Sequence, residues 1–464
     1  MQFNGYGFLF LFLPVVVLLY WVAPRGIPRL LFLIVASCVF YGLWDWRYIP
    51  LLLGTTLVDW AAGEALTRMQ GPRRRKLLLA GAIAVNLALL AYFKYRGFFF
   101  AQTNGLLRLL GAGEPLPALR VFLPIGISFY TFAAISYAVD VYRGTIRPAK
   151  TVIHYLAWAT LFPYLTAGPI IRYGHVGEQL EQAQQRFRIS LIGSGLFFLC
   201  MGLAKKVLVA DVMATYVNQL FAHHTHLGLW SGWAAALGYT LQLYFDFSGY
   251  SDMAVGVALM IGLRFPQNFD SPYKAVNPSD FWRRWHMSLS SWLRDYLFIP
   301  LGGSRGTTFA TVRNLLITFL LAGLWHGPAW TFVFWGLLWG VFQSVHVLAR
   351  KYGFTPSWVW LNRALTFLAA VVAWVFFRAT SMRSAADVLA AMAGLKGVSG
   401  AGRLPVAPVL AGFILGGLLW VNLLPNSWQV KLEPKMRYAL VLGVLLGAAL
   451  LALSRPSPFL YFQF

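Results

Sequence analysis

The segment Asp280–Gly306 reads DFWRRWHMSLSSWLRDYLFIPLGGSRG, and the segment Asn314–Gly327 that follows it reads NLLITFLLAGLWHG. The first segment is basic, aromatic and rich in serine, whereas almost all of the remaining chain is apolar. Each segment contains one histidine, His286 in the first and His326 in the second. We expect these two histidines to converge on one buried reaction site.

The composition indicates a membrane protein. Of the 464 residues, 59% are hydrophobic and 11% are charged, whereas about a quarter of a soluble domain is charged. Repeated apolar runs predict an all-α polytopic fold with about 11–14 membrane helices, several of them short. No long polar stretch separates the runs, so we expect a single membrane domain over residues 1–464. The main runs are Phe8–Ala23, Leu30–Trp44, Leu51–Leu66, Leu77–Tyr95, Phe122–Val141, Val152–Ile171, Leu191–Leu203, Val207–Phe221, Leu229–Phe245, Val312–Trp325, Trp330–Val347, Leu365–Phe377, Val406–Leu423 and Ala439–Leu453.

The net charge of +23 raises the alternative of nucleic-acid binding, but the charge distribution argues against it. The basic residues form short clusters at the ends of apolar runs, for example Arg68–Lys76 and Lys205–Lys206. This distribution is typical of the excess of Lys and Arg in cytoplasmic loops of membrane proteins. We therefore assign Arg68–Lys76 to the cytoplasm, and we expect a phospholipid bilayer, not nucleic acid, as the surrounding partner.

The residues around His286 have the pattern of an amphipathic helix. With Asp280–Leu297 as one helix, Trp285 and Trp292 share a narrow aromatic face and His286 lies at the border of the apolar face. Such a helix fits an interfacial or re-entrant position. A purely structural alternative, with tryptophans as membrane anchors and arginines near phosphate, explains the arginines and tryptophans but explains His286 less well.

His326 carries the stronger signal for chemistry. It follows a nearly uncharged run, and Gly327–Pro328 breaks the helix directly after it. An ionisable residue within a membrane is by default a candidate functional residue, and a neutral imidazole is suited to general-base work. The alternative is a packing histidine that is hydrogen-bonded in place.

Acyl transfer to a hydroxyl fits this setting, since the chain lacks HExxH and a phosphate-binding glycine loop. Asn314, Ser290 or tryptophan indole N–H groups could stabilise the oxyanion, and the sequence leaves the choice among them open.

Two other polar stretches have competing interpretations. DFSGYSD, Asp246–Asp252, interrupts an apolar run and fits either a turn outside the membrane or the wall of a polar cavity. HHTH, His223–His226, fits a solvated loop better than a metal site, because no further Cys, Asp or Glu adjoins it in the sequence. We expect no bound metal.

Several long motifs give the chain a resemblance to the membrane-bound O-acyltransferases, within which it looks like the bacterial branch that includes the alginate O-acetyltransferase subunit of the inner membrane. The resemblance covers essentially the whole chain, with its densest motifs in the central region 240–345. The motifs are DFSGYSDMAVG, NFDSPY, DFWRRWHMSLSSWLRDYLFIPLGG, RNLL, LWHGPAWTFVFWG, FNGYGFLFLFLP, LPIGISFYTF, AGPIIR, GLAKKVLVAD and FLYFQF.

The resemblance carries expectations about fold and activity. It implies helices ringed around a central funnel, with re-entrant segments, and a bacterial inner-membrane location. It implies that His326 is catalytic and that His286 is a second functional histidine. The implied donor is acetyl-CoA, with no tightly bound cofactor. The implied acceptor is an exopolysaccharide such as alginate, reached through a periplasmic acetyltransferase partner.

The aromatic tail at residues 456–464, PSPFLYFQF, has a plain interpretation as an apolar segment tucked into the protein. The sharper hypothesis is that Tyr461 accepts the acyl group as a phenyl ester, since in the related D-alanine transfer system a small partner protein ends in a similar motif. Alternative functions are acetyl transfer to peptidoglycan or another wall polymer, D-alanyl transfer from a carrier protein, and a membrane transporter without enzyme activity.

Overall fold

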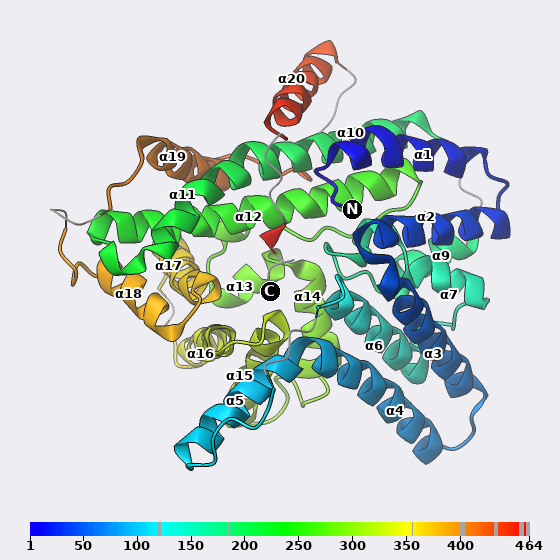
Figure 1. Cartoon of the computed structure of the whole chain (residues 1–464), viewed down its shortest axis with the longest axis horizontal. Coiled ribbons are helices and arrows are strands. Elements are labelled where there is room, and N and C mark those ends of the chain that lie inside the picture. The colour runs from blue at the N-terminus through cyan, green and yellow to red at the C-terminus, as the bar shows by residue number, and fades with distance from the viewer. Residues whose placement is uncertain are drawn as a thin grey trace. The chain divides into compact units, whose positions relative to one another are not determined.

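Every regular element that the structure describes is a helix. The computed structural model describes residues 1–117, 122–182, 186–354, 356–398, 404–430, 435–453 and 459–460. Within these residues the elements are α-helices joined by short 3-10 and π-helical turns, which confirms the predicted all-α class (Figure 1). The chain divides into two compact units, Met1–Gly195 with Val257–Pro266 and Leu196–Gly256 with Gln267–Phe464. The expectation of a single membrane domain stays a prediction.

The first unit is built around α3, α4 and α6, which lie side by side (Figure 1). Asn86 on α4 donates a hydrogen bond to Asp59 on α3 over 2.6 Å, and both side chains are buried. Position 63 on α3 requires glycine, because a Cβ atom there would lie 2.5 Å from the ring of Tyr137. The elements of this unit are η1 (Gly7–Phe12), α1 (Leu13–Val22), α2 (Ile27–Asp45), η2 (Trp46–Tyr48), α3 (Ile49–Arg68), α4 (Pro72–Leu90), η3 (Ala91–Tyr95), α5 (Arg96–Leu109), α6 (Ile127–Arg143), α7 (Val152–Ala159), α8 (Phe162–Leu165), α9 (Tyr173–Gln182) and the start of α10 (Ile189–Leu203).

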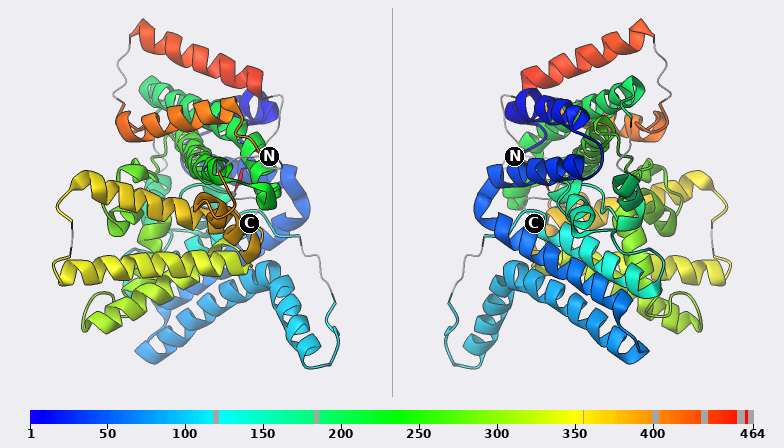
Figure 2. Two further views of the ribbon diagram at one scale, coloured as in Figure 1. Left: turned by 90° about the vertical axis from the view of Figure 1, so that its left-hand side faces the viewer. Right: turned by 90° about the vertical axis from the view of Figure 1, so that its right-hand side faces the viewer.

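The second unit contains both histidines of interest. Its helices α15, α16 and α17 pack one on the next (Figure 2). Its elements after α10 are η4 (Ala204–Ala210), α11 (Asp211–Ala222), η5 (His224–His226), α12 (Leu229–Met260, whose last turn belongs to the first unit), η6 (Pro272–Lys274), α13 (Pro278–Arg284), α14 (Met287–Leu293), η7 (Arg294–Phe298), α15 (Thr308–His326), α16 (Trp330–Lys351), α17 (Val359–Arg378), α18 (Met382–Met392), α19 (Pro408–Leu423) and α20 (Met436–Ala452).

Several helices are long and apolar enough to cross a membrane. By length and composition, five such segments occur among the described residues: Ile27–Arg68, Pro72–Leu109, Thr308–His326, Trp330–Lys351 and Val359–Arg378. Shorter apolar helices are found at Gly7–Val22, Pro408–Leu423 and Met436–Ala452. These helices support a multi-pass membrane protein. The count of about 11–14 membrane helices and the ring around a funnel stay predictions.

Helix α12 corrects the prediction for DFSGYSD. The helix runs unbroken through this motif, and the side chains of Asp246 and Asp252 are buried. The stretch is therefore not a turn outside the membrane. Lys205 pairs with Asp252 and Lys206 pairs with Asp246, each over 2.6 Å, and the alternative of a polar cavity wall stays a prediction.

The prediction that Lys205 and Lys206 are loop cations at the end of an apolar run is wrong, because both side chains are buried. They are 4% and 2% exposed and belong to the turn of π-helix η4. The backbones of the two segments approach closely, since a Cβ atom at Gly202 would lie 2.4 Å from the carbonyl oxygen of Gly249. This approach brings Lys205 and Lys206 against α12, where the opposite charges compensate one another.

Candidate active site

His326 is the last residue of α15, as the sequence predicts. Thr307 caps the start of this helix by accepting a hydrogen bond from the Ala310 N–H over 3.1 Å. At the other end Gly327 is extended and Pro328 follows, so the helix stops and α16 returns alongside it from Trp330.

The hairpin of α15 and α16 closes at two glycines. A Cβ atom at Gly323 would lie 2.3 Å from the carbonyl oxygen of Phe332 and 3.1 Å from the backbone of Gly336. The helices therefore touch through their backbones one turn before His326. This close crossing brings the imidazole against side chains of α16.

The imidazole of His326 lies in an aromatic enclosure. Its ring centroid is 4.9 Å from that of Trp325, 4.8 Å from that of Trp335 on α16 and 5.1 Å from that of Phe377 on α17. His326 is 4% exposed. The expected apolar setting is thus confirmed, with a ring held edge to face by its neighbours. Its catalytic role stays a prediction.

His286 is placed differently from the expectation. The predicted continuous helix over Asp280–Leu297 is wrong, because α13 ends at Arg284 and α14 begins at Met287. His286 forms the turn between them in a left-handed conformation, with φ of 43° and ψ of 55°. A non-glycine residue in this region is uncommon and clusters at functional sites. Sequence periodicity carries no signal for such a turn.

A polar network orients His286. The Oδ1 atom of Asn268 accepts hydrogen bonds from the N–H and the hydroxyl of Ser288, at 3.2 and 2.8 Å. The same oxygen lies 3.2 Å from Nδ1 of His286, so a neutral imidazole donates from Nδ1 and keeps its lone pair on Nε2. His286 is fully buried in a turn outside the five apolar helices, and burial lowers the pKa of His286 to about 3.

One ring connects the surroundings of the two histidines. Trp374 on α17 contacts Trp285, which precedes His286, with ring centroids 4.8 Å apart. Trp374 also stacks at 5.8 Å on Trp335, the neighbour of His326. Both histidines therefore border the same aromatic cluster of the second unit. That they serve one reaction stays a prediction.

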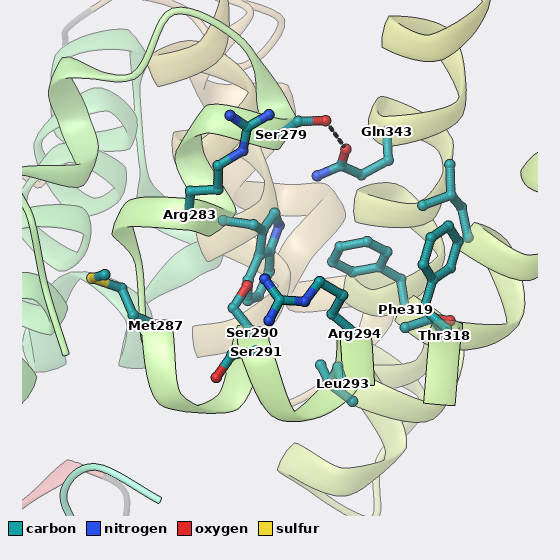
Figure 3. A pocket seen from close by; sticks show the side chains of 13 residues that line it. Ser279, Arg283, Met287, Ser290, Ser291, Leu293, Arg294, Thr318, Phe319 and Gln343 are labelled. Atoms are coloured by element: carbon teal, nitrogen blue, oxygen red, sulfur yellow. Dashed lines mark hydrogen bonds between the residues drawn. The ribbon is translucent and has the colours of Figure 1, made fainter. Parts of the chain in front are cut away.

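A pocket of about 280 Å³ opens beside this cluster. Figure 3 shows one wall made by Arg283, Ser290 and Arg294, and an opposite wall that includes Phe319 of α15. Trp282 also lines the pocket and contacts Trp335, the neighbour of His326, with ring centroids 5.9 Å apart. Since Phe319 precedes His326 by two helical turns, this pocket lies roughly 10 Å from His326 along the axis of α15.

A second pocket of about 520 Å³ shares Ser279, Arg283, Phe298, Leu315 and Gln343 with the first. The hydroxyl of Ser279 donates to Gln343 over 2.7 Å, across the shared wall (Figure 3). The second pocket adds His346, Arg350 and Lys351, and among the described residues no Asp or Glu lines either pocket. The pair of pockets is therefore electropositive, a feature that sequence spacing does not reveal because its residues come from several elements, α13, α14, η7, α15, α16 and the loop before α15.

The three candidates for an oxyanion donor separate in the structure. Asn314 donates to the carbonyl oxygen of Gly303 over 3.0 Å and lies roughly 18 Å from His326 along α15, so it is too distant. Ser290 lines the smaller pocket. The indole nitrogens of Trp282 and Trp335 are buried, and they have no hydrogen-bond partner among the described residues. Among these candidates, the indole ring of Trp335 contacts His326.

Two other predicted sites are the tail residue Tyr461 and the HHTH tract. Tyr461 lies outside the described residues, although Phe459 and Leu460 directly before it are described and buried. In the HHTH tract, Nδ1 of His224 lies 2.8 Å from a carboxylate oxygen of Asp387. Among the described residues, no group of three or more His, Cys, Asp or Glu side chains could hold a metal ion.

Comparison with known proteins now assigns the class. Residues 121–385 match the model of the membrane-bound O-acyltransferase family. The chain is 41% identical over 396 residues to the probable alginate O-acetylase of Azotobacter vinelandii, covering 84% of this chain and 78% of that protein. The chain belongs to the membrane-bound O-acyltransferase family.

Other relatives differ in the polymer that their names mention. A peptidoglycan O-acetyltransferase of Helicobacter pylori is 38% identical over 432 residues, which cover 86% of this chain and 80% of that protein. A teichoic acid D-alanyltransferase of Bacillus subtilis is 30% identical over 261 residues, which cover 54% and 66%. The family is one of enzymes, so acyl transfer replaces the transporter alternative.

Proposed function

We propose that this protein transfers an acetyl group from acetyl-CoA in the cytoplasm to a hydroxyl acceptor, and that the acetyl group finally reaches an exported polysaccharide such as alginate through a periplasmic acetyltransferase. The proposed location is the bacterial inner membrane. The observation that carries the proposal is the position of His326, buried among aromatic rings two helical turns from an electropositive pocket.

The direction of transfer follows from the charges of α15 and α16. Arg305 lies just before α15 and Arg313 in its second turn, and Arg350 and Lys351 end α16, so the cations gather at one end of this helix hairpin. The opposite end, from His326 to Trp330, has no Lys or Arg. The positive-inside rule assigns the basic end, with its pockets, to the cytoplasm.

A phosphate-bearing thioester matches the pockets. Arg350 and Lys351 are exposed at the larger pocket, where the Lys351 ammonium donates to the Thr308 hydroxyl over 2.7 Å. Guanidinium and ammonium groups bind phosphates through charge-assisted hydrogen bonds. The smaller pocket continues toward Trp282 and Phe319 with a mostly apolar lining, which suits the thioester end of such a donor.

The proposed chemistry is an acyl exchange with His326 as general base. The imidazole takes the proton of the acceptor hydroxyl while its oxygen forms a bond to the thioester carbonyl carbon. The carbon–sulfur bond then breaks, and the proton passes from the imidazolium to the departing sulfur, so an ester and a free thiol result. We assign the stabilisation of the intermediate oxyanion to a buried indole N–H.

We further propose that Tyr461 is the first acceptor. Its phenol would lose a proton to the base and become a phenyl ester, and a partner hydroxyl would then displace the phenol, which regains a proton. Support comes from Phe459, which is separated from His286 by the single ring of Phe247. Tyr461→Phe keeps the aromatic side chain but removes the nucleophile. Normal polymer acetylation in that variant would exclude this role.

Three kinds of acceptor polymer or acyl group are suggested by the names of the relatives. Alginate is favoured because the names of relatives at 38–42% identity over about four-fifths of the chain mention it. The second candidate is peptidoglycan or another wall polymer, supported by the relative from Helicobacter pylori. D-alanyl transfer is supported by a relative that matches over a shorter part of this chain.

The testing experiment compares the wild type with His326→Ala and with His223→Ala, a matched change at an exposed histidine. Membranes that contain each protein are incubated with acetyl-CoA labelled in its acetyl group, with the periplasmic acetyltransferase and with the polymer. The amount of labelled acetyl ester on the polymer is then measured. We expect His326→Ala to lower the ester content at least 100-fold and His223→Ala to leave it unchanged. Equal ester content in both variants, at equal amounts of membrane protein, would exclude His326 as the base.

A further inference from the structure

Two buried residues of the C-terminal tail are held by α12. Phe459 is 2% exposed and Leu460 is 6% exposed. The backbone N–H of Leu460 donates a hydrogen bond to Oδ2 of Asp246 over 3.1 Å, across 214 residues of sequence. A buried backbone N–H that cannot donate to water needs another acceptor, so this contact fixes the tail at one point.

Aromatic stacking fixes the same point from a second side. The ring of Phe459 stacks on Tyr250 at 4.4 Å with an interplanar angle of 25°, and lies 5.5 Å from Phe247. Phe247 in turn meets the imidazole of His286 edge to face at 4.6 Å. The same stretch of α12 thus holds the tail and borders His286.

The two oxygens of Asp246 have different partners. Oδ1 lies 2.6 Å from Nζ of Lys206, while Oδ2 takes the Leu460 N–H. Lys206 also lies 2.6 Å from Oδ1 of Asp211. Asp246 therefore accepts from a buried lysine through one oxygen and from the tail through the other, so both of its oxygens are satisfied where the side chain is buried.

We propose that Asp246, oriented by Lys206, is a positioning residue that anchors the tail at residues 459–460 beside His286 and so delivers the segment that carries Tyr461 to the reaction site. The delivery rests on the proposed function of Tyr461. The anchoring itself does not, since it concerns contacts of described residues alone. The two parts can therefore be tested separately.

The chain supplies a matched control for Asp246. Asp252 lies on the same helix, is 4% exposed and is also paired with a buried lysine, Lys205, over 2.6 Å. Its further partner is the hydroxyl of Ser427. Loss of Asp252 removes a comparable buried charge without removing the acceptor of Leu460.

The experiment measures access to the tail in the full-length protein. Leu460→Cys keeps the backbone N–H, and it is introduced into a background in which Cys38 and Cys200 are replaced by Ser and Ala. The rate of maleimide labelling is then compared among the parent, Asp246→Ala and Asp252→Ala. We expect labelling to rise at least tenfold in Asp246→Ala and less than twofold in Asp252→Ala.

A second variant guards against a failure to fold. Asp246→Ala combined with Lys206→Met removes both members of the more deeply buried pair, and it takes the lysine only from Asp211, whose side chain is 14% exposed. We expect the same rapid labelling as in Asp246→Ala, because the acceptor of Leu460 is absent in both. Labelling at the parent rate in this folded double variant would overturn the anchor.

Acyl transfer by the same variants separates the anchor from the function of the tail. We expect rapid labelling and at least a tenfold fall in acyl ester on the polymer to occur together in Asp246→Ala. Rapid labelling with full ester content would support the anchor and exclude the delivery role. Unchanged labelling would exclude the anchor, whatever the ester content.

Discussion

The imidazole of His326 meets the indole of Trp335 edge to face, with ring centroids 4.8 Å apart and an interplanar angle of 86°. Trp335 is fully buried and also contacts Trp282, which lines the smaller pocket. This tryptophan therefore stands between the predicted base and the pocket proposed for the donor. We expect the orientation of His326 to depend on this contact.

Removal of the Trp335 ring should damage both stability and activity. Trp335→Ala leaves a large cavity beside His326, and we expect it to cost about 3–5 kcal/mol of unfolding free energy. Trp335→Phe keeps an aromatic contact, and we expect it to retain most of the stability and activity within about tenfold. Thermal unfolding in detergent and the acyl-transfer rate check both. A larger loss of rate in a stably folded Trp335→Phe protein would indicate that the indole N–H stabilises the oxyanion. Removal of one such donor lowers the rate about 100- to 1000-fold.

The basic pocket predicts a selective effect on donor binding. Replacement of both Arg350 and Lys351 by Gln removes two charges from its wall, and we expect the KM for acetyl-CoA to rise about tenfold at low salt, since exposed charge contacts contribute up to about 1 kcal/mol each. The kcat should change less than twofold because neither residue borders His326. Gln replacements of Arg73 and Arg74, exposed cations at the start of α4, serve as the control. An equal rise of KM in the control would argue against a local binding site.

His286 predicts a particular dependence of stability on pH. Its folded-state pKa of about 3 lies below the unfolded value of 6.5. Between these values the unfolded state binds the extra proton, so stability falls as pH falls below 6.5 and gains nothing further above it. We expect a contribution of up to about 1.4 kcal/mol per pH unit from this one group.

The measurement is the unfolding midpoint in detergent from pH 7.5 to 5.0. His286→Asn is the matched variant, because Asn tolerates the left-handed conformation at this turn and has no charge to gain. Its midpoint should fall less steeply with pH than that of the parent. Parallel curves for the two proteins would show that His286 is not buried as a neutral group.

The close crossing of α15 and α16 predicts unequal responses to alanine. Gly323→Ala places a methyl group 2.3 Å from the Phe332 carbonyl oxygen, and we expect it to cost about 1–3 kcal/mol and to displace His326. Gly443→Ala on α20 has nothing within 4 Å of the new atom and should be neutral or slightly stabilising. Unfolding midpoints and acyl-transfer rates of both variants provide the check. Equal stability of the two would mean that the helices separate at no cost.

Much of the candidate site was predictable where the signal is local. The apolar run before His326, with Gly327–Pro328 after it, indicates a buried helix end, and the structure has that end at His326. Hydropathy determines this because a helix in lipid satisfies its own backbone groups and needs apolar side chains. The family motifs, read in order, likewise determine the enzyme class.

Tertiary structure decided what depends on partners distant in the sequence. Asp246 and Asp252 look like breaks in a helix until Lys206 and Lys205 are brought against them, because a buried charge is tolerated only when it is paired. His286 looks like a residue on a helix face until Asn268 holds it in a left-handed turn. The electropositive pockets and the tail anchored at Asp246 arise in the same way. The sequence by itself thus determined the helices and the class of chemistry, whereas long-range contacts decided how the charged and polar side chains are used.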